Sequence, residues 1–362
     1  MRPSRNTRGV LRQVHLWMGL VLGLPFAVIA ATGLPVTYWY ASDALFAPGY
    51  YAGTISKPRA SFDALAASAR KAVPTANLQS VVLLPDYGTA QAALTLSGGK
   101  QREVSLDAAT GRVIGVRSLD DAAISWLYSV HTRLALDRAG LDLAGRIAVM
   151  LLAAMFVVLA LSGVILWWPR SWRWRVLAPT IRPRHRWLDL HNKSGIYALV
   201  PVALAAATTL LLEFPATRTL GGEIPPVVAF KANPGAQPLE QLARLASAAT
   251  PGRPLLGVFG IEEPVPLQVT TGDEWGGYRW ITVDRRTGRL LLISSSRPRD
   301  LPGPPDASFL ISLHQGHRWG SMGQAVFAIA SLVPLLLYAS GVTHWVNRRR
   351  RSYDRSRSRC RS

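Results

Sequence analysis

The sequence predicts a helical membrane protein with four spanning helices and two small α+β domains on one side of the membrane. Of its 362 residues, 49% are hydrophobic and only 17% are charged, and the mean hydropathy is +0.16. Such a balance is unusual for a soluble protein of this size. Four stretches reach the roughly 20 apolar residues that cross a bilayer. They are 16–38, 147–168, 195–213 and 324–346.

The first apolar stretch superficially resembles a signal peptide, because Arg2, Arg5, Arg8 and Arg12 precede it. Its apolar core is longer than the roughly 7–15 residues of a signal peptide. It also resembles 190–213, which is internal and cannot be an N-terminal signal. We therefore predict a permanent helix.

Positive charge is concentrated in three short segments. Residues 1–15, 169–193 and 347–362 together carry +17 of the formal net charge of +20. All three flank the same ends of the apolar stretches, which predicts that both termini and the 169–193 loop are cytoplasmic. The basic tail is then a topology anchor on anionic lipid rather than a nucleic-acid site. We expect a multi-pass protein of a bacterial inner membrane.

These patterns give a full set of expected boundaries. They are a cytoplasmic N-terminus 1–15, helix 16–38, outer domain 40–144, helix 147–168, cytoplasmic basic loop 169–193, helix 195–213, outer domain 214–323, helix 324–346 and cytoplasmic tail 347–362.

Cysteine use excludes two further classes. Cys360 is the single cysteine, so neither a disulfide framework nor a Cys-x-x-Cys-His attachment of haem is possible.

Aromatic residues gather at the expected membrane interfaces, as in an aromatic belt. Among them are Tyr38, Trp39, Tyr40, Trp167, Trp168, Trp172, Trp174, Trp319 and Trp345.

The two outer segments have the same local pattern. In the first, "SFDALAASARKAV" has helical spacing, and "LQSVVLL", "AALTLS" and "EVSLDAATGRVIGV" indicate strands and hairpins. In the second, "LEQLARLASAA" indicates the helix and "YRWITVDRRTGRLLLI" the closing hairpin. "SWLYSVH" at 125–131 also matches "SFLISLH" at 308–314, and "LSGVILWW" at 161–168 matches "ASGVTHWV" at 339–346. We predict a helix–domain–helix unit written twice, an internal parallel two-fold repeat.

Together these motifs resemble the PepSY-associated transmembrane family. The resemblance depends on "LRQVHLWMGL", "LDLHNKSGIY", "LYSVH", "LISLH" and the "D-x-x-TG-x" hairpins, and it covers nearly the whole chain. The resemblance implies two PepSY-like outer domains. The family that the chain resembles includes inner-membrane di-haem reductases that act on siderophore-bound iron. The chain departs from the simplest pattern by His317, His344 and the "LDRAGLDL" insert.

Four of the seven histidines form two symmetric pairs in the repeat. His15 and His191 open the first and third helices, and His131 and His314 precede the second and fourth. Neutral imidazoles ligate haem iron, and two give a six-coordinate site. We therefore predict one haem b between His15 and His191 and a second between His131 and His314. Gly19 and Gly195, four residues beyond the first pair, are expected to leave room for the porphyrin.

Other side chains complete or compete for these sites. Arg12, Arg133 and Arg318 are expected partners for the haem propionates, because arginine suits carboxylates. His344 lies at the expected depth of His15 and His191 and competes for that site, and His317 could replace His314 or contact a substrate. His185 lies among arginines and is expected to be solvated. Zinc and di-iron sites are disfavoured because no thiol or carboxylate accompanies a pair.

The predicted function is transmembrane electron transfer. The resemblance implies a ferric siderophore as the periplasmic acceptor, hence a role in iron acquisition. The sequence has no nicotinamide or flavin fingerprint, so quinol or a cytoplasmic reductase would be the donor. The alternative is a haem-free membrane-anchored PepSY module that binds peptides or regulates a partner protease. A permease is disfavoured, because four helices without a clearly broken pair do not fit a transporter.

Overall fold

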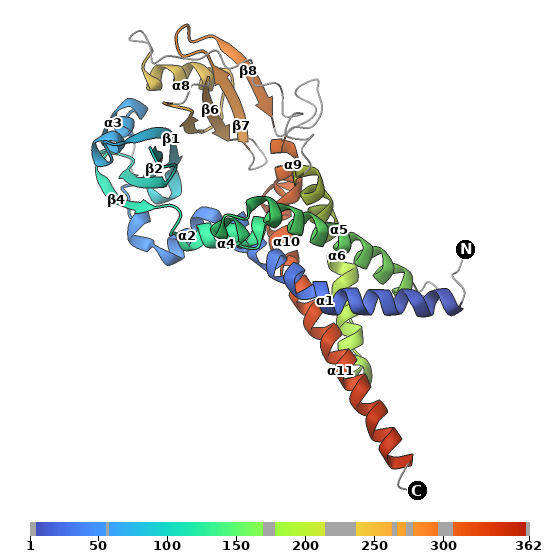
Figure 1. Ribbon diagram of the computed structural model, residues 1–362. Coiled ribbons are helices and arrows are strands. Elements are labelled where there is room, and N and C mark those ends of the chain that lie inside the picture. Colours follow the sequence, from blue (N-terminus) through green and yellow to red (C-terminus); the bar gives the residue numbers. More distant parts are fainter. Residues whose placement is uncertain are drawn as a thin grey trace.

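The computed structural model places long helices beneath an outer β-sheet (Figure 1). It describes residues 5–55, 58–168, 178–213, 237–262, 266–272, 278–295 and 307–359. Parts of the predicted basic loop (169–177) and of the second outer segment (214–236 and 296–306) lie outside the described residues, as does Cys360.

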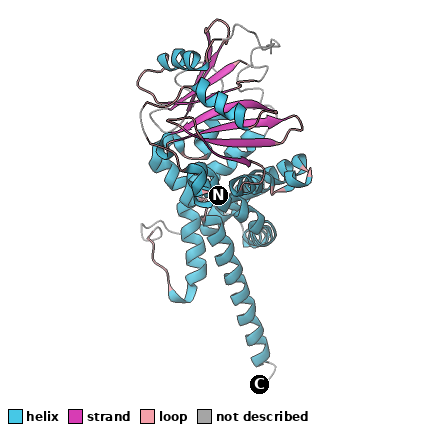
Figure 2. Ribbon diagram, turned by 90° about the vertical axis from the view of Figure 1, so that its left-hand side faces the viewer, coloured by secondary structure: helices cyan, strands magenta, loops and turns pink. Residues whose placement is uncertain are grey.

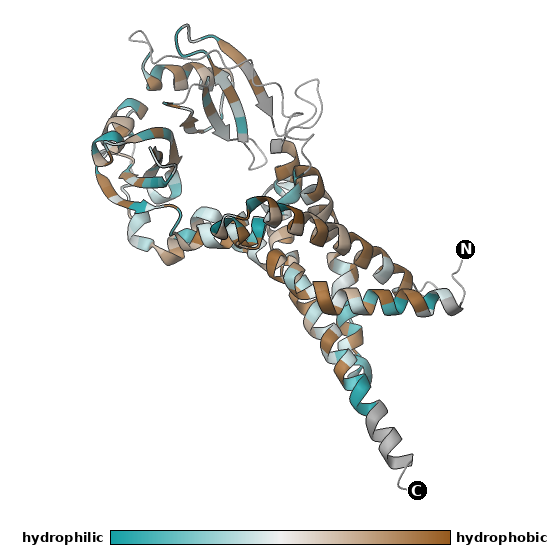
Figure 3. Cartoon of the chain, in the orientation of Figure 1, coloured by the Kyte–Doolittle hydropathy of each residue, from teal (hydrophilic) through white to brown (hydrophobic). Residues whose placement is uncertain are grey.

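Four apolar segments have the length and hydropathy of membrane spans, which confirms the prediction of four long apolar helices. The segments are Thr7–Thr37, Asp142–Trp167, Pro183–Glu213 and His317–Arg351. Their main helices are α1 (Arg5–Thr37), α5 (Asp142–Trp167), α6 (Arg186–Glu213), and α10 (Gly320–Ala330) followed by α11 (Val333–Arg359). Figure 3 shows apolar residues along these helices and hydrophilic residues toward the chain ends.

The fourth apolar stretch, predicted as one helix over 324–346, consists of two helices. It breaks at Ser331 and Leu332, between α10 and α11. Pro334 follows the break, and proline both lacks an N–H donor and clashes with the carbonyl four residues earlier, here that of Ala330. The Leu332 N–H instead bonds the Ile329 carbonyl at 3.1 Å.

The long helices contact one another in a closed cycle: α1 with α5, α5 with α6, α6 with α11, and α11 with α1. Toward the chain ends they separate into two groups, as Figures 1 and 2 show. The helices α1 and α5 extend toward the N-terminus, whereas α6 and α11 extend toward the C-terminus. The two halves of the chain, with α1 and α5 in one and α6 and α11 in the other, therefore contact each other at the centre of the molecule.

Short helices fill the connections. Six lie between the long helices and the sheet: α2 (Trp39–Phe46), η1 (Pro48–Tyr51), α4 (Ala123–Arg133), η3 (Leu136–Ala139), α9 (Ala307–His314) and η6 (His317–Trp319). Two others lie elsewhere: η2 (Pro85–Tyr87) joins β1 to β2, and η5 (Pro183–His185) precedes α6. Arg117 ties the sheet to α2, because it forms ion pairs with both Asp43 of α2 and Glu103 of the sheet. Both carboxylates are buried, so these two ion pairs hold the sheet against α2.

The outer part is one antiparallel sheet of eight strands in the order β4-β3-β2-β1-β5-β6-β7-β8. The strands are β1 (Ala76–Leu84), β2 (Thr89–Leu96), β3 (Gln101–Asp107), β4 (Val113–Ser118), β5 (Leu255–Phe259), β6 (Leu267–Gly272), β7 (Tyr278–Val283) and β8 (Leu290–Ser295). The helices α3 (Phe62–Ala72) and α8 (Leu239–Ala248) pack against it. Figure 2 shows the strands above the long helices.

The two predicted outer segments contribute four strands each to a single sheet. The two central strands, β1 and β5, pair through Ser80, Val81 and Val82 with Phe259, Val258 and Gly257. One hydrophobic core runs through both halves and contains Phe62 of α3 and Leu242 of α8. Each half buries its apolar face against a shared core, so the halves form one unit. The internal two-fold repeat of the whole chain stays a prediction.

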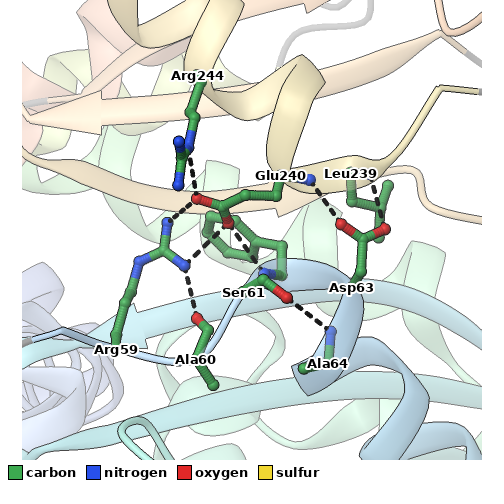
Figure 4. Close-up of polar contacts among 9 residues, drawn as sticks. Arg59, Ala60, Ser61, Asp63, Ala64, Leu239, Glu240 and Arg244 are labelled. Atoms are coloured by element: carbon green, nitrogen blue, oxygen red, sulfur yellow. Dashed lines mark hydrogen bonds and ion pairs between the residues drawn. The ribbon is translucent and has the colours of Figure 1, made fainter.

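The helices α3 and α8 cap one another across this junction (Figure 4). The Asp63 carboxylate of α3 accepts hydrogen bonds from the Leu239 and Glu240 N–H groups at 2.9 and 3.0 Å. In return, the Glu240 carboxylate accepts one from the Phe62 N–H at 3.0 Å. It also pairs with Arg59 at 3.0 Å. At the N-terminus of each helix, a carboxylate from the other half of the chain therefore accepts hydrogen bonds from the free N–H groups.

Candidate functional site

Two histidine pairs lie where the halves of the chain meet. In the inner pair, on the side of the chain termini, His15 of α1 faces His191 of α6 with ring centres 6.3 Å apart. In the outer pair, beside the sheet, His131 of α4 faces His314 of α9 at 6.0 Å. The structure thus brings together the two partners in each predicted pair. Each pair takes one ring from each half.

Hydrogen bonds from neighbouring helices hold three of the four rings through Nδ1. His131 Nδ1 lies 2.8 Å from the Ile29 carbonyl oxygen, His191 Nδ1 2.9 Å from that of Leu337, and His314 Nδ1 3.0 Å from that of Ala205. A carbonyl oxygen only accepts, so Nδ1 carries the proton in each case. In the neutral ring, Nε2 then keeps its lone pair for a metal.

Nδ1 of His15 is protonated as well, and its hydrogen-bond acceptor is a serine hydroxyl. Its Nδ1 lies 2.8 Å from Ser162 Oγ. The Ser162 hydroxyl donates its one proton to the Leu159 carbonyl at 3.0 Å, so it accepts from His15. All four rings therefore have the same tautomer. Hydrogen bonds to the ring nitrogen that does not bind the metal orient metal-ligating histidines in proteins.

The outer pair is kept neutral by its surroundings. Burial lowers the pKa of His131, and burial together with the neighbouring His131 lowers that of His314 to about 4. At neutral pH both imidazoles are uncharged, which is the form that ligates metal. Thr32 and Thr208 add hydroxyl contacts to the same Nδ1 atoms, at 3.3 and 3.0 Å.

The ring separations fit a metal centre between the members of each pair. Half of each separation is about 3 Å. A metal–imidazole bond is about 2 Å long, and the ring centre lies roughly 1 Å beyond the nitrogen. No group of three or more histidine, cysteine, aspartate or glutamate side chains that could hold a metal ion occurs within the described ranges. Two histidines per site, without further protein ligands, suit haem better than zinc.

The two pairs are attached to α1 and α6 at different points along these helices. Fourteen residues separate His15 from Ile29 on α1, and fourteen separate His191 from Ala205 on α6. At the helical rise of 1.5 Å per residue, each interval spans about 21 Å. The contacts of the outer pair with α1 and α6 therefore lie about four helical turns from the inner pair.

Three glycines make room beside the rings. A Cβ at Gly163 would lie 3.3 Å from His15 Cε1, one at Gly341 3.4 Å from His191 Nδ1, and one at Gly33 3.3 Å from His131 Cε1. These differ from the glycines that the sequence suggested. The Cβ position of Gly19 has no atom within 4 Å, and that of Gly195 meets Leu337.

The three predicted propionate partners have different surroundings. Arg133 pairs with Asp142 at 2.8 Å and Glu213 at 3.0 Å, joining α4 to α5 and α6. Arg318 lies over the Phe309 ring at 5.7 Å. Arg12 is exposed on α1, one turn before His15.

The remaining histidines lie outside the two pairs. His344 lies on α11. His185 is exposed in η5, as expected from its arginine neighbours. His317 begins η6, three residues after His314.

Sequence reasoning missed the residues that hold the rings. Ser162–Gly163 and Ser340–Gly341 are the "SG" of the repeated "LSGV" and "ASGV" motifs. Ser340 Oγ lies 3.4 Å from His191 Nδ1, much as Ser162 does from His15. The repeat itself was the available signal, because a small hydroxyl and a glycine recur where a helix must pass close to a ring.

Fold and site together define a multi-pass membrane protein with four candidate spans, paired histidines between them and an outer antiparallel sheet. Residues 12–356 match the family described as the PepSY-associated TM region. The chain therefore belongs to that family. The comparison with curated proteins found no match.

Proposed function

We propose that the protein carries electrons across the membrane through two haem b groups and reduces ferric iron held by a siderophore. The observation that supports this most is that all four histidines are protonated and hydrogen-bonded at Nδ1. Each is held through Nδ1 by a neighbouring helix, and each faces its partner at 6.0–6.3 Å. Haem, when bound, supplies a reversible one-electron iron couple.

These positions support a role for each residue. His15 and His191 would hold the inner haem, and His131 and His314 would hold the outer one. Gly33, Gly163 and Gly341 let the neighbouring helices approach the rings closely. Arg12, which is exposed, and Arg318, which lies over Phe309, would be partners for the propionates, whereas Arg133 fixes α4 against α5 and α6 through its two ion pairs.

The path runs between the two sides of the membrane. A donor on the inner side, quinol or a cytoplasmic reductase, supplies one electron at the level of His15. A ferric siderophore accepts it at the outer side, and the resulting ferrous iron binds hard oxygen ligands more weakly. The spacing of about 21 Å along α1 and α6 divides the crossing into shorter steps. This acceptor comes from the resemblance to di-haem siderophore-iron reductases.

Single alanine substitutions at the four histidines test the ligand assignment. Each removes one of the two imidazoles that would ligate a haem, so we expect one haem to be lost or become high-spin while the other stays six-coordinate. Visible and electron paramagnetic resonance spectra of the purified variants distinguish these states. Reduction of a ferric siderophore by the loaded protein should fall in all four. His185→Ala is the matched control and should leave both spectra unchanged.

His344→Ala decides the competing assignment. If it removes the inner haem while His191→Ala retains it, the inner site is built from His15 and His344, and the symmetric pairing is wrong. Purified protein that has no reducible haem bands would instead favour a haem-free module that binds peptides or regulates a protease.

A further inference from the structure

A cavity opens at the inner ends of α6 and α11, away from the histidine pairs. It has a volume of about 350 Å³ and is lined by Pro183, Arg184, Arg186, Trp187, Asn347, Arg350 and Arg351. Four of these seven residues are arginines, and they come from two segments far apart in the chain. We call it the arginine pocket.

The arginines of the pocket are available for an external anion. Among the described residues, the nearby carboxylate of Asp189 is already engaged by Arg182, at 2.7 and 2.9 Å. The ion pairs found within the described ranges include none of the four pocket arginines. Four guanidinium groups around one cavity repel one another, so an anion between them relieves that repulsion.

The pocket lies at the depth of lipid headgroups. It begins at Pro183, where one candidate span starts, and includes Arg351, where another ends. Trp187 forms part of the wall, and the Arg186 guanidinium lies over its ring at 5.1 Å. Tryptophan and arginine at the end of a spanning helix are typical of the interface between hydrocarbon and water.

The geometry points to a phosphate-bearing ligand. Guanidinium groups bind phosphate oxygens with two parallel hydrogen bonds, and basic pockets between spanning helices suit anionic headgroups. We propose that the arginine pocket binds the headgroup of an anionic phospholipid such as phosphatidylglycerol. The bound lipid would then bridge the start of α6 and the end of α11. This proposal does not depend on the haem sites.

Mass measurement of the intact full-length protein, released from detergent with its lipids, tests the proposal. Phosphatidylglycerol should remain bound at concentrations where phosphatidylcholine does not. Arg350→Gln with Arg351→Gln should weaken phosphatidylglycerol binding by roughly 25-fold, or about five-fold for each arginine. Arg184→Gln with Arg186→Gln removes the opposite wall and should act similarly, which guards against misfolding of one variant.

The matched control is Arg348→Gln with Arg349→Gln. It changes the same charge on the same helix, but neither residue lines the pocket, and Arg349 lies over Trp345 at 4.6 Å. We expect less than a three-fold loss. Equal losses in the control and the pocket variants would show diffuse attraction and overturn the proposal.

Soluble competitors distinguish the source of the phosphate. Inorganic phosphate and glycerol 3-phosphate should fail to displace phosphatidylglycerol at millimolar concentrations, because the lipid is also held by the membrane-facing surface. If glycerol 3-phosphate displaces the lipid at micromolar concentration, the pocket binds a soluble phosphate ester and the lipid assignment is wrong. An acidic protein that competes while both lipids bind equally would also contradict it.

Discussion

At the scale of single residues, buried polar groups connect parts of the chain that no local pattern joins. Asp107 is one such residue. It ends β3, and its carboxylate accepts hydrogen bonds from Thr54, Ala109 and Thr110. The Thr54 contacts attach the segment after η1 to the β3–β4 turn. The sequence showed the "DAATG" turn but not this link, because Thr54 lies 53 positions away.

Replacing Asp107 by asparagine should destabilise the outer sheet in a pH-dependent way. Although burial acts to raise the pKa of Asp107, hydrogen bonds from Thr54 and Thr110 lower it to about 2. A lowered carboxylate pKa gives stability above the unfolded value of about 4, and this stability is lost as pH falls toward 2. At pH 7 we expect a loss of about 2 kcal/mol. The difference from wild type should shrink between pH 4 and pH 2.

Thermal unfolding of both proteins at pH 7 and pH 3 measures this difference. Asp284→Asn is the control, since Asp284 accepts bonds only from its own turn, at Arg286 and Thr287, in the contacts that the structure describes. Equal destabilisation by the two substitutions, or a difference that does not depend on pH, would contradict the role of Thr54.

At the scale of elements, the helices and strands follow from sequence, but their partners do not. Local spacing predicted α3, the hairpins and the four apolar helices. Pairing of β1 with β5 joins residues about 180 positions apart, and an edge strand carries no signal for which edge it will meet. For this reason the sequence did not show that the two predicted outer segments, 40–144 and 214–323, share one sheet. The break before α11 was likewise marked only by Pro334.

Loss of Glu240 should weaken the junction between the two halves of the sheet. Glu240→Ala removes the cap on α3 and leaves the partly buried Arg59 unpaired. We expect a cost of about 2–3 kcal/mol. Asp63→Ala removes only the cap on α8 and should cost about 1 kcal/mol.

Chemical denaturation of the full-length protein in detergent measures both effects. Asp86→Ala, at an exposed position in η2, is the surface control. Because Asp63 and Glu240 share one interface, the double variant should lose less than the sum of the single variants. A Glu240→Ala protein as stable as Asp86→Ala would show that the reciprocal caps do not hold the halves together.

At the scale of the whole molecule, the charge pattern predicts which side of the membrane each part occupies. The three basic segments carry +17 of the +20 net charge, so the sheet should lie outside the cytoplasm. A reporter that is active only in the periplasm should be active when fused after residue 100 or 270. It should be inactive after residue 185 or at the C-terminus. Activity in the reverse positions would invert the proposed direction of electron transfer.

The candidate site could be predicted from the sequence further than the fold around it. Repeat spacing paired His15 with His191 and His131 with His314, because equivalent positions in a repeat lie at equivalent depths. It could not reveal that Leu337, Ala205 and Ile29 hold the rings, since backbone carbonyls leave no trace in composition. Nor could it show that Arg133 forms ion pairs with Asp142 and Glu213.

The ratio of haem to protein in purified wild-type material distinguishes the di-haem proposal from a haem-free protein. We expect two non-covalent haem b groups per chain, both low-spin and six-coordinate. Acidified organic solvent should extract both, because Cys360 is the single cysteine and cannot supply a Cys-x-x-Cys-His attachment. Protein that is folded, inserted in the membrane and supplied with haem during expression, yet contains none, would rule out the di-haem proposal.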